Sequence, residues 1–371
     1  MTQWLFAPGR VPEVHAGPPL AHYAVLLFRR DTSMRRSCRV LASILVIASI
    51  AIGLSPVLAE SPASVAVRVD HHTHLNSPAI QSFIPTFCES IKRFGKCDVA
   101  LTTPHSPEDL LAAMDRAGIK RALVLSTGYL PESPMMDPPP ANAAQLMRAA
   151  NDWTVGLVHD HPGRFRAFIA VDPLRPTALA EIARWKGNTA VTGLKLHLTS
   201  SGVDLRNDAH VAAFAGVFRA AAKAHWAILV HLRTQRGDYG ATDVQRFIKD
   251  VLPAAAGTPV QIAHAGGWGG IDKATLSALG AFADAMQSDP PAFRHVWFDL
   301  SGVWTDKTSS SDKHALVQLI RKIGPRHFLP GSDWPYNGTD LADYYGRIYP
   351  QLPLTRAEWA VIRANVAPYA R

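Results

Sequence analysis

Eight short apolar runs rich in β-branched residues, separated by longer segments of helical periodicity, constrain the fold of this chain most strongly. The predicted strands are residues 66–72, 120–126, 165–171, 191–198, 226–232, 259–264, 295–301 and 327–332. Apolar residues at three- and four-residue spacing predict helices at 107–117, 142–159, 177–185, 211–224 and 243–251. Eight strands alternating with helices over about 300 residues predict an α/β fold, a (β/α)8 barrel of the TIM type.

Two long connections depart from this alternation. Residues 77–106 follow the first predicted strand, and residues 129–141, which include five prolines, follow the second. Segments that follow barrel strands lie above the mouth of the barrel, so we expect both there. No linker rich in proline, glycine or serine divides the rest of the chain, and residues 60–371 are predicted to form one barrel domain.

The amino-terminal region has the pattern of a secretory signal. Residues 34–59 combine a basic start, an apolar run at 40–54 and small residues up to Ala59. The apolar run is shorter than the roughly 18 residues of a membrane-spanning helix, so stable membrane insertion after signal cleavage is not expected. We predict that residues 1–33 are a mis-called start, that Met34 is the initiator, and that the mature protein is exported, periplasmic or secreted.

Cysteine content and net charge narrow the context further. Removal of the signal leaves Cys88 and Cys97, which could close a disulfide in an oxidising compartment or remain two free thiols. Six of the 38 basic and two of the 30 acidic residues precede Glu60, which leaves a net charge of +4 and no basic cluster. We therefore expect a small-molecule substrate and no nucleic-acid partner, and the sequence leaves a homo-oligomer open.

Histidines and an aspartate gather at the carboxyl ends of the predicted strands. His72 and His74 lie two residues apart, so on a strand they point to one face, while His71 points to the other. Later strands end in His231, in His264 and in Asp333. Barrel enzymes keep their active sites at this end, and imidazole and carboxylate groups are ligands that zinc prefers. The pattern predicts a metal site at the barrel mouth.

On these motifs the chain resembles the metal-dependent amidohydrolase superfamily. The resemblance is to its amidohydrolase-related branch, which includes carboxymuconate-semialdehyde decarboxylase and relatives that hydrolyse lactones or C–N bonds. It spans about residues 66–370 and is carried by DHHTH at 70–74, GLKLH at 193–197, LVH at 229–231, IAHAGG at 262–267 and GSDWP at 331–335.

The resemblance implies a ligand set and catalytic roles. His72, His74, His231 and Asp333 are expected to surround a divalent metal, most often one zinc ion, with a second ion not excluded. His264 would bind a second metal, polarise the substrate or move protons. Zinc with an open coordination position lowers the pKa of bound water to about 7. Asp333 could touch the metal and also take the proton of that water.

Four further residues are predicted substrate contacts. Lys195 and His197 share one face of the fourth strand. In two-metal members of the superfamily a carboxylated lysine on this strand bridges the ions, whereas in one-metal members Lys195 would contact an anionic substrate, with His197 beside it. Arg233 and Trp268 follow the fifth and sixth strands, where they would suit the anionic and apolar parts of a planar acid.

Three functions are compatible with this pattern. Our main prediction is a metal-dependent hydrolase that attacks an amide, lactone or related ester carbonyl with a metal-activated water. The first alternative is a metal-dependent, non-oxidative decarboxylase of a small aromatic carboxylic acid. The second is a non-catalytic exported protein that binds a small molecule. A serine hydrolase is disfavoured, because the chain contains no Gly-x-Ser-x-Gly motif.

Overall fold

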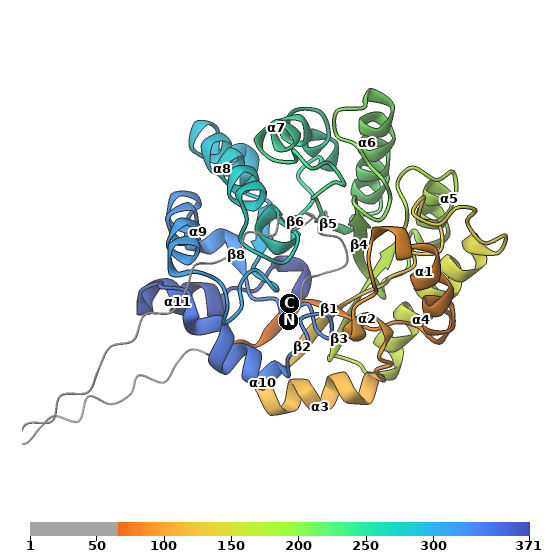
Figure 1. The fold of residues 1–371 in the computed structure, drawn as a ribbon, viewed down its shortest axis with the longest axis horizontal. Coiled ribbons are helices and arrows are strands. Elements are labelled where there is room, and N and C mark those ends of the chain that lie inside the picture. Colours follow the sequence, from red (N-terminus) through yellow and green to blue (C-terminus); the bar gives the residue numbers. More distant parts are fainter. Residues whose placement is uncertain (1–65) are drawn as a thin grey trace, which may run out of the picture. The chain divides into compact units, whose positions relative to one another are not determined.

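The computed structural model describes residues 66–371, and these form a parallel barrel ringed by helices (Figure 1). The predicted start at 1–33 and signal at 34–59 lie outside the described residues. Neighbouring strands pair in parallel in chain order, β1 to β8. Their bounds are Val69–His74, Arg121–Leu125, Phe165–Ala170, Val191–His197, Ala227–His231, Val260–Ile262, Val296–Asp299 and Phe328–Leu329.

The first and last strands meet through the segment that follows β8. Thr73 bridges in parallel to Trp334, and the backbone N–H of Asp333 donates to the carbonyl of His72 at 2.7 Å. The prediction of a (β/α)8 barrel is therefore confirmed. β6 and β8 are shorter than predicted. In β6 the backbone leaves the extended conformation within the predicted range, because His264 has φ 53°.

Helices cover the outside of the barrel. The α-helices are α1 Pro78–Ser90, α2 Val99–Thr102, α3 Pro107–Ala117, α4 Ala143–Asp160, α5 Thr177–Trp185, α6 Asp208–Lys223, α7 Ala241–Asp250, α8 Lys273–Ser288, α9 Ser310–Ile323, α10 Leu341–Asp343 and α11 Arg356–Ala364. α3 begins at a capping box of Ser106 and Asp109 and ends at Gly118 in left-handed conformation. α6 begins three residues before its predicted start, because the side chain of Asn207 caps it.

Alternation along each strand divides the core into two layers. On β5, Ile228 and Val230 pack outward against the helices, whereas Ala227 and Leu229 fill the inside of the barrel. On β4 the inward position of Gly193 has no room for a side chain, since a Cβ there would lie 2.2 Å from the ring of Phe168. Ala367 and Ala370 join the inner layer, so residues 366–370, here called the C-terminal plug, close one end.

The predicted first connection is mostly helical and packs as a unit. Residues 78–102, here called the cap, contain α1, the 3-10 turn η1 (Lys92–Phe94) and α2. Cys88 and Cys97 form a disulfide with their Cα atoms 5.6 Å apart, which settles the alternative left open by the sequence. Phe87 and Leu101 of the cap pack with Leu130 of the second long connection. Within residues 66–371, no helix combines the length and apolarity needed to cross a membrane.

Candidate active site

His72 and His74 form the centre of the site at the end of β1. Their Nε2 atoms lie 3.2 Å apart, although pairing between β1 and β2 shifts register between Asp70 and Thr73. The Nδ1 atom of His74 lies 3.0 Å from the carbonyl oxygen of Leu125, which can only accept a hydrogen bond. Nδ1 of His72 lies 3.0 Å from a carboxylate oxygen of Asp299. Both rings therefore carry their proton on Nδ1 and present a bare Nε2 lone pair to each other.

Asp333 completes a cluster of acceptors that fits a cation. Its Oδ1 lies 3.3 Å from Nε2 of His72 and 3.4 Å from Nε2 of His74, and all three side chains are buried. Three lone-pair atoms so close together repel one another unless a positive charge lies between them. Two imidazoles and one carboxylate match the donors of a divalent metal site, so the residues fit the ion that the sequence predicts.

His231 lies in the same cavity but outside this tight cluster. The ligand atoms of His72, His74 and Asp333 fall within 4.8 Å of one another, and His231 is not in that group. Its Nε2 atom is buried and has no hydrogen-bond partner among the described residues. A buried imidazole nitrogen without a partner is costly, and a metal ligand position accounts for it. The structure therefore brings together three of the four predicted ligands and leaves the fourth free to join them.

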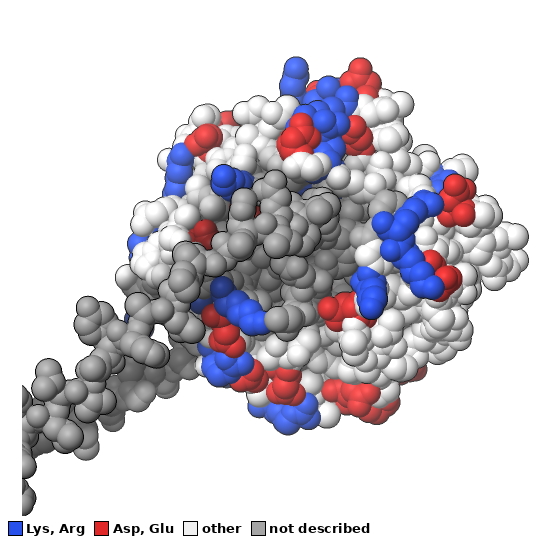
Figure 2. All heavy atoms as spheres, viewed as in Figure 1, with Lys and Arg blue, Asp and Glu red and all other residues white. Residues whose placement is uncertain are grey.

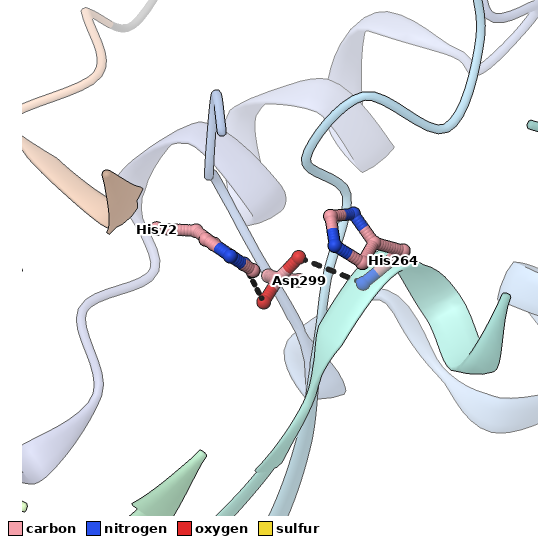
Figure 3. Close-up of side chains that lie close together, drawn as sticks. All are labelled: His72, His264 and Asp299. Carbon is pink, nitrogen blue, oxygen red and sulfur yellow. Dashed lines mark hydrogen bonds and ion pairs between the residues drawn. The ribbon is translucent and has the colours of Figure 1, made fainter. Parts of the chain in front are cut away.

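Asp299, at the end of β7, orients two of the histidines (Figure 3). One of its oxygens accepts from Nδ1 of His72, and the other accepts from the backbone N–H of His264 at 2.9 Å. Although Asp299, His72 and His264 also form a group compact enough for a metal, Asp299 faces the protonated nitrogen of His72. Asp299 thus fixes the tautomer and direction of a ligand rather than binding the ion itself.

His264 faces the cavity from a strained backbone. Its φ is 53° and that of Ala265 is 52°, in the left-handed region that residues other than glycine rarely adopt. Its Nδ1 donates to the carbonyl of Ser301 at 2.7 Å, which leaves Nε2 unprotonated toward the cavity. This placement is compatible with the predicted role at the substrate.

Lys195 and His197 point into the barrel mouth from β4. Nζ of Lys195 lies 3.1 Å from Nε2 of His72, and the residue is 1% exposed. Nδ1 of His197 accepts from the backbone N–H of Ser200 at 3.2 Å, and its ring lies 4.0 Å from the ring of His231. The alternation that placed both on one face is correct, and Lys195 approaches the metal ligands directly.

Burial keeps the imidazoles of the site neutral. It lowers the pKa of His72 to about 3, with the charge of Lys195 adding to the effect and Asp299 opposing it. It also lowers the pKa values of His74 and His231 well below their ordinary range. Burial raises the pKa of Asp333 and lowers that of Lys195. Neutral imidazoles are the form that binds a metal, so the environment prepares the ligands for it.

A cavity of about 80 Å³ opens above these groups. The cap contributes Phe87, Asp98, Ala100 and Leu101 to its wall, and Trp268 also lines it. Arg233 does not line the cavity: its guanidinium donates to Asp272 at 2.7 Å, outside the mouth. The expectation that Arg233 grips the substrate anion is therefore corrected, because an ion pair with the next loop holds it away.

Sequence reasoning missed two tyrosines of this cavity. Tyr336 stacks on the ring of His74 at 4.8 Å, and its hydroxyl donates to Asn76. Tyr129 lies 5.1 Å from the ring of His197 and lines the cavity, and its hydroxyl has no hydrogen-bond partner among the described residues. Tyr129 begins the proline-rich connection expected above the mouth, which was the available signal.

Comparison with known proteins places this site in a protein family. Residues 69–358 match the model of a protein family described as Amidohydrolase. No curated protein matches the chain. Similar solved structures include 5-carboxyvanillate decarboxylase from Sphingomonas paucimobilis, with a TM-score of 0.57 and 18% identity over 81% of this chain and 97% of that one.

Two further structures are comparably similar. The 5-carboxyvanillate decarboxylase of Novosphingobium aromaticivorans, complexed with manganese and 4-hydroxy-3-methoxy-5-nitrobenzoic acid, gives a TM-score of 0.52 and 15% identity over 82% of this chain and 95% of that one. The 2,6-dihydroxybenzoate decarboxylase from Rhizobium gives a TM-score of 0.51 and 15% identity over 80% of this chain and 96% of that one. At these identities the likeness shows the shared fold.

The comparisons contradict the main functional prediction. Hydrolysis of an amide, lactone or ester carbonyl was expected, but these structural neighbours are decarboxylases of aromatic acids. They agree with the first alternative instead. The prediction was wrong because the same ligands serve both reactions, and sequence motifs report the ligands and not the bond that breaks.

Proposed function

The chain belongs to the amidohydrolase family and is an enzyme of that superfamily with a divalent-metal site, and from this premise we propose that it is a metal-dependent, non-oxidative decarboxylase of a small aromatic carboxylic acid. The observation that carries the proposal is a buried acidic residue, Asp333, beside the metal-binding histidines in a cavity with aromatic walls. The similarity to decarboxylases of benzoic acids supports it.

The shape of the cavity suits a planar ring. On one side lies the ring of His197, with the ring centroid of Tyr129 at 5.1 Å and that of Trp268 at 5.9 Å from its own. On another, Tyr336 stacks on His74. Aromatic rings gain from offset and edge-to-face packing, so these walls favour an aromatic acid over an aliphatic one.

Charges in the cavity suit one carboxylate. Lys195 is the only lysine or arginine among the described residues that line the cavity, and it reaches the metal ligands. Because Arg233 is paired with Asp272, the carboxylate of the substrate would bind beside Lys195 and the metal ligands. A divalent ion held by His72, His74, His231 and Asp333 would supply a Lewis acid there that fixes the acid group and stabilises negative charge.

Asp333 is placed to supply the proton that the reaction requires. Its Oδ1 faces the imidazoles, and its Oδ2 has no hydrogen-bond partner among the described residues. Burial raises its pKa, which is the direction that a proton donor requires. We assign Oδ2 as the atom that donates this proton to the ring carbon bearing the carboxylate.

The step balances without any oxidant. The bond between the ring carbon and the carboxylate breaks, its electron pair remains on the ring carbon, and CO₂ leaves. The proton from Asp333 forms the new C–H bond, and Asp333 then regains a proton from solvent. Phe87, Leu101 and Leu130 line the cavity and keep water from the reacting carbon.

We propose zinc as the resident ion, because three imidazoles and one carboxylate match its preferences. Manganese is the second candidate, supported by its presence in the Novosphingobium enzyme. One ion accounts for the donors that converge, since the ligand atoms of His72, His74 and Asp333 lie within 4.8 Å of one another.

Export remains part of the proposal, and the Cys88–Cys97 disulfide supports it because such bonds persist in oxidising compartments. On the face drawn in Figure 2, basic and acidic side chains lie beside one another rather than in a field of one sign. This mixture supports a small-molecule substrate rather than nucleic acid.

Decarboxylation is tested on the purified protein loaded with Zn²⁺ or Mn²⁺. Hydroxybenzoates and methoxyhydroxybenzoates are screened for CO₂ release, and a reaction in D₂O is followed by NMR. We expect one deuterium at the ring carbon that carried the carboxylate. Asp333→Asn should abolish turnover. Hydrolysis of amides or lactones with no CO₂ from any acid would overturn the proposal.

A further inference from the structure

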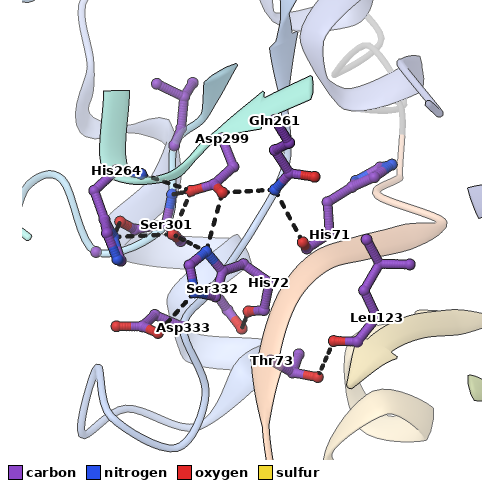
Figure 4. A network of polar contacts seen from close by, with 12 residues as sticks. His71, His72, Thr73, Leu123, Gln261, His264, Asp299, Ser301, Ser332 and Asp333 are labelled. Carbon is purple, nitrogen blue, oxygen red and sulfur yellow. Dashed lines mark hydrogen bonds and ion pairs between the residues drawn. The ribbon is translucent and has the colours of Figure 1, made fainter. Parts of the chain in front are cut away.

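A chain of buried hydrogen bonds joins the C-terminal plug to a metal ligand. The hydroxyl of Tyr369 donates to Oε1 of Gln261 at 2.5 Å. Nε2 of Gln261 donates to Oδ2 of Asp299 at 2.6 Å and to the carbonyl of His71 at 3.1 Å. The same Asp299 oxygen accepts from Nδ1 of His72 at 3.0 Å. Figure 4 shows Gln261 between Asp299 and His71.

The direction of each bond in this chain is determined. The Asp299 carboxylate and the His71 carbonyl only accept, so the amide nitrogen of Gln261 faces them and its oxygen faces Tyr369. Tyr369 must then be the donor. Hydrogen bonds in series polarise one another, so the hydroxyl strengthens donation from Gln261 to Asp299.

A second link ties the plug to β1. The backbone N–H of Ala367 donates to Nε2 of His71 at 3.2 Å, and Nδ1 of His71 donates to the carbonyl of Pro330 at 2.9 Å. His71 is adjacent to His72 in sequence and faces away from the cavity. His71 was predicted to point away from His72 and His74. In that direction it attaches the plug and the segment after β8 to β1, the strand that carries those two ligands.

Burial makes these bonds hard to replace. Gln261, Asp299, His71 and His72 are all fully buried, so an amide or carboxylate that loses its partner there gains no water in exchange. Tyr369 itself is partly buried. Removal of its hydroxyl would leave Oε1 of Gln261 unpaired and free the amide to turn away from Asp299.

We propose that Tyr369 and Gln261 are positioning residues of the metal site, which hold the Asp299 carboxylate and through it the ring of His72. The plug at the closed end of the barrel thereby sets metal affinity at the open end. This inference concerns metal binding alone, and it holds whichever reaction the enzyme catalyses.

The test compares Tyr369→Phe with the wild type in the full-length protein. Bound metal is removed with a chelator, and Zn²⁺ affinity is measured by competition with a chromophoric chelator. Partners that touch a ligand contribute about 10- to 100-fold to metal affinity. Tyr369 is separated from Asp299 by two hydrogen bonds, so we expect loss of its hydroxyl to raise the Zn²⁺ Kd by about 3- to 10-fold. Gln261 touches Asp299 directly, so we expect Gln261→Leu to raise it by about 10-fold or more.

Tyr349→Phe is the matched control. The Tyr349 hydroxyl is buried but has no hydrogen-bond partner among the described residues, so its loss should leave the Zn²⁺ Kd unchanged. Thermal unfolding of each metal-free protein separates folding from affinity. We expect Tyr369→Phe to remain folded and to alter the visible spectrum of bound Co²⁺, which reports ligand geometry.

A double substitution tests whether Tyr369 acts through Asp299. If it does, adding Tyr369→Phe to Asp299→Asn raises the Kd no further than Asp299→Asn alone. An unchanged Kd in Tyr369→Phe, or equal changes in Tyr369→Phe and Tyr349→Phe, would overturn the inference. Failure of every acid in the decarboxylation screen would leave this result unaffected, so the two proposals are tested separately.

Discussion

The two ends of the barrel use the same strands for opposite purposes. On the inner face of β5, Ala227 and Leu229 pack in the apolar interior, whereas His231 reaches the cavity with a nitrogen that has no hydrogen-bond partner within residues 66–371. The apolar end is closed by the C-terminal plug, and the open end holds several neutral imidazoles. We therefore expect the apolar end to contribute to the stability of the fold and the open end to bind the metal. On β5 these two roles fall on successive inward-facing residues, Leu229 and His231.

The largest expected effect removes two ligands from the open end. His72→Ala combined with His74→Ala should weaken Zn²⁺ binding by about a thousandfold or more, since metal binding energy of about 10 kcal/mol is shared among a few ligands. The metal-free variant should stay folded, because the substitution also relieves crowded lone pairs. Metal content measured after dialysis checks this, with His159→Ala on the exposed surface as control. Stoichiometric metal in the double variant would refute the site.

The next prediction contrasts adjacent layers of β5. Leu229→Ala should lower the free energy of unfolding by about 3 kcal/mol through the cavity it leaves, with the Zn²⁺ Kd unchanged. His231→Ala should do the reverse, weakening metal binding while the metal-free protein keeps its stability. Denaturant unfolding and metal competition on both variants measure the contrast. Parallel losses in both measurements would show that the two ends are not separate.

A buried carboxylate away from the metal site, Asp172, shows what an ionisable group costs the folded state. Asp172 follows β3, and burial raises its pKa from 3.8 to about 7. The folded state holds this proton longer than the unfolded state, so its contribution to stability is lost as pH rises from about 4 to about 7. Oδ1 of Asp172 accepts from the backbone N–H of Leu174, which asparagine can reproduce.

Asp172→Asn should therefore stabilise the protein at pH 8 relative to pH 5. A shift of this size is worth about 4 kcal/mol, and loss of the ion pair with Arg175 at 3.6 Å offsets part of it. We expect a gain of about 2 kcal/mol at pH 8, measured by denaturant unfolding at both pH values. A variant whose stability follows the wild type at both pH values would contradict the prediction.

The smallest expected effect concerns Tyr129 in the cavity wall. Tyr129→Phe keeps the ring beside His197 and removes a hydroxyl that has no partner in the described part of the chain. If that hydroxyl contacts the substrate, kcat/KM for the acid found in the decarboxylation screen should fall about tenfold, with metal content unchanged. Unfolding should be unaffected. An unchanged kcat/KM would assign Tyr129 to packing alone.

Regular periodicity made the fold readable from the sequence. The bounds of α3 and α5 match their predicted ranges, and all eight strands occur where expected. The ends of strands were less accurate: β6 stops at Ile262 and β8 at Leu329. β6 ends just before His264 and Ala265, which take the left-handed conformation, and local sequence preference does not report this.

The site was readable only in part. Spacing of two along β1 identified His72 and His74, because alternation is a local property of strands. Arg233 was misplaced, because its ion pair with Asp272 joins loops 39 residues apart. Tyr129 escaped notice since no periodicity governs the irregular connection that carries it.

Local pattern by itself determined which residues form strands, which face each side chain takes and which residue types meet at the barrel mouth. Tertiary structure alone decided which of these groups converge, that Cys88 and Cys97 pair, and that Tyr369 at the end of the chain reaches His72 through Gln261 and Asp299. The physical reason is distance along the chain. Alternation acts between neighbouring residues, whereas a shared hydrogen bond depends on where the closed barrel places residues that lie hundreds of positions apart.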